Sequence, residues 1–291
     1  MFQAHLRGRS RRHLDQSAQA MEQRLYWTCL KSECEMREVV GVPPTGIFNV
    51  ADPDAFPSPP AEEPRPEGAS IDGSASELQS VFRNSWFYYL SEIAFRRISN
   101  RVTRALHDKP SSGWLTYPIH QLYRLAQELE DQVTQLSERL PFEMDEQSSS
   151  SPQKELEFFL EARNMDIRER IWRPFLFIAI HSSADIEQDQ TVQSCAATAL
   201  SLVCRIIRQF CIKHRHHGAW YAARHIFACA LILLAAAKSG RVQMPPDWPE
   251  LVALSEIHLS YWEDECTDLG VARKVLIQVR QRVQEQENAN T

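Results

Sequence analysis

Glycine is scarce in this sequence, with 9 residues among 291. Sheet-rich folds and phosphate-binding loops use glycine at backbone positions with positive φ, so its scarcity argues against both. Alternation of apolar and polar residues is also missing over any useful length, and apolar residues recur instead at intervals of three and four. We therefore expect an all-α, multi-helix globular bundle, whose 43% of hydrophobic residues can form a sizeable core.

Positive charge does not dominate the chain, because its formal net charge is −6 and its isoelectric point is about 6.0. Proteins that bind the phosphate backbone of nucleic acids present a positive field, so direct DNA binding by this chain is not expected. The local exception is the basic N-terminal segment, residues 1–18, which includes Arg11 and Arg12. This charge density would suit a nuclear localisation signal, although a solvated helix end is the simpler interpretation.

Long hydrophobic runs are absent as well. The most apolar stretch, from Ile226 to Ala237, is about half the roughly 20 residues that a membrane-spanning helix needs. No apolar segment follows the basic N-terminal run, so a secretory signal is not expected. These features predict a soluble, intracellular protein without membrane contact, in which this stretch is a buried core helix.

The seven cysteines are odd in number and irregularly spaced, and no Cys-x-x-Cys pair occurs. A disulfide framework and a zinc cluster both need paired cysteines at regular intervals. The pattern therefore predicts buried free thiols in a reducing compartment.

Motifs for catalysis and cofactor binding are missing too: there is no Gly-x-Ser-x-Gly, phosphate loop or dinucleotide fingerprint. The His-rich tract at 213–217 lacks the ligand spacing of a metal site, and the acidic clusters at 185–189 and 263–265 lack the full aspartate-rich pattern of magnesium-dependent helical synthases. We expect no catalytic, cofactor-binding or metal-binding residues and no enzyme activity. The alternative is a helical enzyme or accessory protein of a biosynthetic pathway, with convergent carboxylates in a polar pocket.

Apolar periodicity predicts helices along most of the chain, within one helical domain at 19–291. In the first helix, Leu25, Cys29, Met36 and Val40 lie near one face. The expected helices span residues 19–40, 78–106, 119–140, 154–183, 191–214, 219–239, 249–265 and 268–286.

Two segments rich in proline, serine or acidic residues predict flexible loops, at about 49–76 and 144–153. Inside the helix expected at 154–183, Pro174 should break or kink the backbone, since proline lacks the N–H that the helix needs.

Two segments resemble the fungal-specific transcription factor domain, the regulatory middle region of fungal zinc-cluster transcription factors. The first runs from Glu22 to Arg37, with the Leu-Tyr-Trp-Thr-Cys sequence, and continues into a proline-bearing loop at 43–47. The second is Phe87-Tyr-Tyr-Leu-Ser-Glu-Ile-Ala-Phe-Arg-Arg-Ile98, in the order and separation of that family. Trp114 and the Leu140-Pro141 turn fit the same pattern.

The resemblance implies an all-helical regulatory domain that controls transcription in the nucleus, with the cytoplasm as a further location, of metabolic or secondary-metabolite genes. The family's zinc cluster, basic linker and coiled coil precede this region and are absent from this sequence, so either upstream sequence is missing or the protein works as it stands. We expect it to act through protein partners, among them a full-length zinc-cluster regulator. A small-molecule effector stays open, and a cavity lined by aromatic residues would hold it; the candidates are Trp86, Phe87, Tyr88, Trp172 and Trp220.

Overall fold

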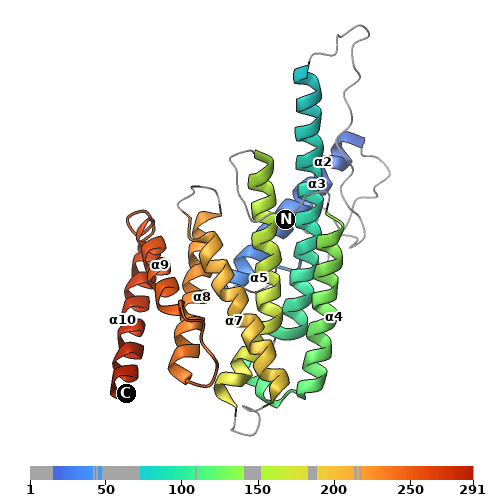
Figure 1. The fold of residues 1–291 in the computed structure, drawn as a ribbon. Coiled ribbons are helices and arrows are strands. Elements are labelled where there is room, and N and C mark those ends of the chain that lie inside the picture. The colour runs from blue at the N-terminus through green and yellow to red at the C-terminus, as the bar shows by residue number, and fades with distance from the viewer. Residues whose placement is uncertain are drawn as a thin grey trace, which may run out of the picture. The chain divides into compact units, whose positions relative to one another are not determined.

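The computed structural model describes residues 16–41, 43, 45–47, 73–108, 110–140, 152–182, 189–212, 215 and 218–290. All regular structure in these residues is helical, and none of them forms a strand, which confirms the all-α prediction. Figure 1 shows the helices in chain order, from α2 in blue to α10 in red. The chain divides into two compact units, and the division runs through the long helices α3 and α5.

The first unit comprises residues 1–97 and 140–160. Its described part contains α2 (Gln16–Val40), most of α3 (Gly73–Val102) and the start of α5 (Pro152–His181). Helix α2 ends at Val40 because Gly41 adopts a left-handed conformation, with φ of 71°, and its N–H donates to the carbonyl of Arg37.

The second unit comprises residues 98–139 and 161–291. It begins with the end of α3, which continues as the π-helical turn η3 (Thr103–His107) and the 3₁₀ helix η4 (Ser111–Thr116). Helix α4 (Ile119–Glu138) buries Leu122, Ala126, Leu129 and Val133 at intervals of three and four, as the sequence predicts.

The rest of the second unit is a bundle of α7 (Gln190–Phe210), α8 (Ala219–Ser239), α9 (Trp248–Ser260) and α10 (Thr267–Asn290). Helix α8 packs against the other three, and α9 packs against α7 and α10. Gly240 ends α8 in a left-handed conformation, with φ of 63°. Asp189 caps the start of α7, where its carboxylate accepts the N–H of Thr191 at 2.8 Å.

The expected helices are all present, and the largest differences lie at their ends. Helix α7 stops at Phe210 rather than 214 because Cys211 leaves the helical region, and α9 stops at Ser260, where a turn begins. Residues 73–76, placed in the predicted loop at 49–76, belong to α3, and residues 152 and 153 belong to α5. The rest of both predicted loops, residues 49–72 and 144–151, lies outside the described residues.

Helix α5 passes through Pro174 without a break, so of the two outcomes expected there, a break or a kink, the break does not occur. A second difference concerns α2: its buried face is not the apolar face recognised in the sequence. Leu25, Met36 and Val40 do share a face, but they are exposed, while the buried face carries Tyr26 and Trp27. Large aromatic rings remove more apolar surface from water than Leu, Met or Val, so they decide which side of the helix turns inward.

Candidate functional site

Helices α2 and α3 and the loop at 45–47 form a hydrophobic core in the first unit. Helix α2 contributes buried side chains from one face, and α3 contributes Ile93, against which Tyr89 and Ile47 also pack. The buried residues from α2 are Tyr26, Trp27, Leu30 and Cys34. The first segment, its proline-bearing loop and the second segment therefore depend on one another for burial.

Polar contacts fix the same pair of helices. The hydroxyl of Tyr89 donates to the carbonyl of Arg24 at 3.2 Å, and burial raises the pKa of Tyr89. Further along, the guanidinium of Arg96 bridges Glu35 on α2 and Glu92 on its own helix. Arg96 and Glu92 are both buried, so this charged group is held between two carboxylates away from water.

The loop after α2 folds back along the helix. Glu33 accepts two hydrogen bonds from Thr45, one from its N–H at 2.9 Å and one from its hydroxyl at 2.6 Å. Gly46 has a φ of 80°, a backbone conformation that side chains disfavour, and it brings Ile47 onto the core. The Thr-Gly-Ile sequence of the resembling loop thus has a direct structural role.

The outward face of α2 is apolar. Met21, Leu25, Met36 and Val40 are 65%, 45%, 40% and 48% exposed. Thr28 and Ser32 are exposed near the middle of this helix, and each hydroxyl donates to the carbonyl four residues earlier. An apolar face of this length on a surface helix is typical of a binding surface.

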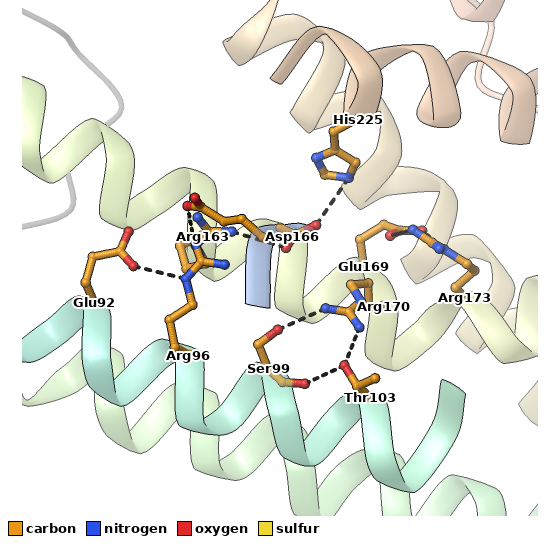
Figure 2. A network of polar contacts seen from close by, with 11 residues as sticks. Glu92, Arg96, Ser99, Thr103, Arg163, Asp166, Glu169, Arg170, Arg173 and His225 are labelled. Atoms are coloured by element: carbon orange, nitrogen blue, oxygen red, sulfur yellow. Dashed lines mark hydrogen bonds and ion pairs between the residues drawn. The ribbon is translucent and has the colours of Figure 1, made fainter. Parts of the chain in front are cut away.

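A second cluster of buried polar residues surrounds α5 in the second unit (Figure 2). Arg170 donates to the hydroxyls of Ser99 at 2.9 Å and Thr103 at 2.6 Å, and Thr103 donates to the carbonyl of Ser99. The fully buried Glu169 accepts from Arg173, which raises the pKa of that arginine. These groups satisfy one another and hold α5 in register with the end of α3.

One helical turn before Arg170, Asp166 lies 3.3 Å from His225 of α8 and 3.8 Å from Arg163 of its own helix (Figure 2). Glu130 of α4 binds both the guanidinium of Arg168 and the indole N–H of Trp172. The polar groups of α5 therefore face three helices of this unit, and their role is to order the packing.

His107 compensates for the proline within α5. Pro174 has no N–H to donate to the carbonyl of Arg170, and the Nε2 atom of His107 lies 2.9 Å from that oxygen. Burial lowers the pKa of His107 to about 4, so the ring is neutral and donates its Nε2–H to the carbonyl. Its ring also packs edge-on against Trp114, at 5.4 Å between centroids.

Helix α9 carries a buried histidine of a different kind. His258 is 3% exposed, neither ring nitrogen has a hydrogen-bond partner among the described residues, and burial lowers its pKa to about 4. Its ring lies near those of Tyr261 and Trp262, and the guanidinium of Arg215 lies 5.6 Å from the Trp262 ring.

The acidic clusters do not converge where the structure describes them. Glu263 pairs with Arg273 at 3.0 Å, and Glu265 binds both terminal nitrogens of Arg215. Asp189 caps α7, and the rest of the cluster at 185–189 lies outside the described residues. Within the described parts of the chain, no group of three metal-ligating side chains occurs. Of the basic tract at 213–217, the structure describes only Arg215.

Two of the aromatic residues proposed to line a cavity contact other aromatic side chains. Trp172 contacts Tyr123 and Phe175, while Trp220 contacts Tyr221 and donates to Asp268 at 3.0 Å. Phe87 is 38% exposed. These contacts are those of ordinary core and surface residues.

All seven cysteines are free, as the sequence predicts, and four of them are buried. Burial raises the pKa of the Cys195 thiol to about 11 and that of Cys211 to about 12, so both stay protonated at neutral pH. Such thiols are weak nucleophiles.

Helix α8 is long and apolar enough to cross a membrane when judged by length and composition alone. The helix has 21 residues, from Ala219 to Ser239, and so extends beyond both ends of the apolar run recognised in the sequence at 226–237. Its buried residues include Ile226, Leu233 and Leu234, and helices α7, α9 and α10 pack on it. Of the most apolar 18-residue window of α8, 39% is buried inside the structure.

The polar residues around α5 were not recognised in the sequence. A signal existed, because Glu169 and Arg173 stand one helical turn apart within an apolar stretch, as do Ser99 and Thr103 on α3. Charges at such positions must be paired when the helix is buried.

Comparisons with protein-family models, with curated proteins and with solved structures found no match to this chain.

Proposed function

We propose that this protein regulates transcription by binding other regulatory proteins, as a chain related to the regulatory region of fungal zinc-cluster transcription factors. The observation that supports this most is the shared core of α2 and α3. The two resembling segments lie about 50 residues apart in sequence, yet Trp27 and Ile93 belong to one buried cluster. Such dependence is expected if the two segments are parts of one inherited module.

The partner that fits best is a full-length zinc-cluster regulator, which would supply the DNA-reading part. A net charge of −6 supports the proposal that the partner, rather than this chain, binds DNA, because the chain itself offers little attraction to the phosphate backbone. By occupying a dimeric regulator in unproductive heterodimers, the protein would dampen expression of a metabolic or secondary-metabolite gene set. Its place of action would be the nucleus.

The alternative, a helical enzyme or accessory protein of a biosynthetic pathway, has less support. It requires carboxylates that converge on a pocket, whereas Glu263 and Glu265 each pair with an arginine. Burial of the Cys195 and Cys211 thiols, with raised pKa values, also gives no activated nucleophile at either position.

Proximity labelling in a fungal host tests the proposal. The tagged full-length chain should label a zinc-cluster regulator in the nucleus, and the purified pair should then bind directly. The control is Ile93→Asp, which places a carboxylate in the shared core and should abolish the labelling. Failure to enrich any transcription protein above this control would contradict the proposal.

A further inference from the structure

On the outward face of α2, the spacing of the exposed apolar residues is the same when it is read from either end of the helix. Met21 and Leu25 are four positions apart, Met36 and Val40 are four positions apart, and ten residues lie between the two pairs. All four side chains are exposed apolar groups on one side of the helix. The midpoint of this pattern lies between Leu30 and Lys31.

A symmetric pattern of this kind fits a second copy of the same helix running antiparallel. Two-fold symmetry requires that if one residue contacts another across the interface, the second contacts the first as well. With α2 crossing its symmetry mate at the midpoint, Met21 lies opposite Val40 of the second copy and Leu25 lies opposite Met36. A partner of different sequence would make no use of this symmetry.

The middle of the face suits a close helix crossing. Thr28, Cys29 and Ser32 are small, and the two hydroxyls already donate to carbonyls of their own helix. Two crossing helices approach most closely at the crossing point and diverge on either side. Small residues at the centre, with the larger Met and Leu side chains towards the ends, match that geometry.

The carboxylates nearest this part of α2 do not need a partner from another chain. Glu33 accepts from Thr45, and Glu35 binds Arg96 on α3. Their negative charges are therefore used within the first unit, and the outward face is left to apolar contacts.

From the symmetric spacing and the small central residues, we infer that α2 is a homodimerisation helix, which pairs antiparallel with α2 of a second copy. One helix from each copy gives an interface at the small end of the known range, below about 1,200 Å². We expect a reversible dimer with a dissociation constant in the micromolar range. The inference does not rest on the proposed function, since it is argued from the spacing and exposure of the α2 residues alone.

Sedimentation equilibrium of the full-length protein across the micromolar range tests the dimer and its register. Leu25→Glu and Met36→Lys, made singly, should each raise the dissociation constant about a hundredfold or more, because each would bury an unpaired charge. The double variant should recover most of the affinity, because the introduced carboxylate then faces the introduced ammonium across the two-fold axis. Both positions are exposed in the single chain, so the thermal unfolding curve measured well below the dissociation constant should not change.

Val271→Glu on α10 is the matched control, since Val271 is 60% exposed and lies outside the inferred interface. This variant should dimerise like the unaltered protein. A monomer at every concentration would overturn the inference, and so would a dimer that ignores the charges at positions 25 and 36. A dimer lost in both single variants but not restored in the double variant would overturn the antiparallel register.

Discussion

Several residues of this protein have roles that only the folded chain reveals. Pro174 leaves a carbonyl of α5 without its helical partner, and His107, from a distant part of the sequence, provides the missing donor. His258 is buried with no hydrogen-bond partner among the described residues for either nitrogen. Both rings are held neutral by burial, and the two cases lead to different predictions.

The pairing of His107 with the backbone of α5 predicts an interaction between two substitutions. His107→Phe should lower the free energy of unfolding by about 1–3 kcal/mol, because the carbonyl of Arg170 loses its donor. In a Pro174→Ala background the alanine N–H can bond that carbonyl within the helix, so the same substitution should cost clearly less. Urea unfolding of the four proteins measures the difference. Equal costs in both backgrounds would show that His107 does not replace the missing N–H.

Burial of His258 predicts a loss of stability in acid. The folded protein protonates this ring only near pH 4, whereas the unfolded chain does so near 6.5. The free energy of unfolding should therefore fall as the pH is lowered through this window, by roughly 3 kcal/mol for this group. His258→Phe removes this titrating group and should reduce the pH dependence, leaving the part contributed by His107, whose pKa burial also lowers to about 4. Urea unfolding at several pH values measures the reduction. An unchanged pH dependence in the variant would contradict this account.

Among the helices of the first unit, α2 and α3 are joined by several kinds of contact. Their contact combines an apolar cluster, the hydroxyl of Tyr89 on a backbone carbonyl of α2, and the buried guanidinium of Arg96 between two carboxylates. The proline-bearing loop adds Thr45 on Glu33. Each of these features lies within the two segments that resemble the fungal family.

The inward face of α2 predicts where truncation destabilises the protein. Trp27→Ala should lower the free energy of unfolding by about 3–5 kcal/mol, since the indole is 5% exposed in the core. Met21→Ala, on the outward face of the same helix, should change it by less than about 0.5 kcal/mol. Urea unfolding of both variants provides the comparison. Similar losses in the two would mean that the inward and outward faces have been assigned wrongly.

Helix positions could be predicted from sequence because apolar residues at intervals of three and four mark each one, as in α4. The orientation of α2 could not, because both of its faces carry apolar residues and only the contact with Ile93 decides between them. The bond to the carbonyl of Arg170 was also out of reach, since it comes from His107, which lies 63 residues earlier in the chain. The network around Arg170 needed the spatial meeting of α3 and α5.

In the whole molecule, the inferred dimer and the proposed function depend on different contacts. The dimer depends only on the outward face of α2, whereas regulation of transcription requires specific protein partners. Within the described residues, the polar groups of α5 and of the α9–α10 turn are engaged in packing contacts. These groups stabilise the packing of the second unit.

A tethered reporter assay in fungal cells tests directly whether this protein regulates transcription through protein contacts. The full-length chain is fused to an unrelated DNA-binding domain, and transcription of a reporter with the matching sites is measured against that domain alone. We predict a several-fold change in transcription, lost when Trp27→Ala disrupts the shared core of α2 and α3. An unchanged reporter, with the intact fusion present in the nucleus, would contradict the claim that this protein regulates transcription through protein contacts.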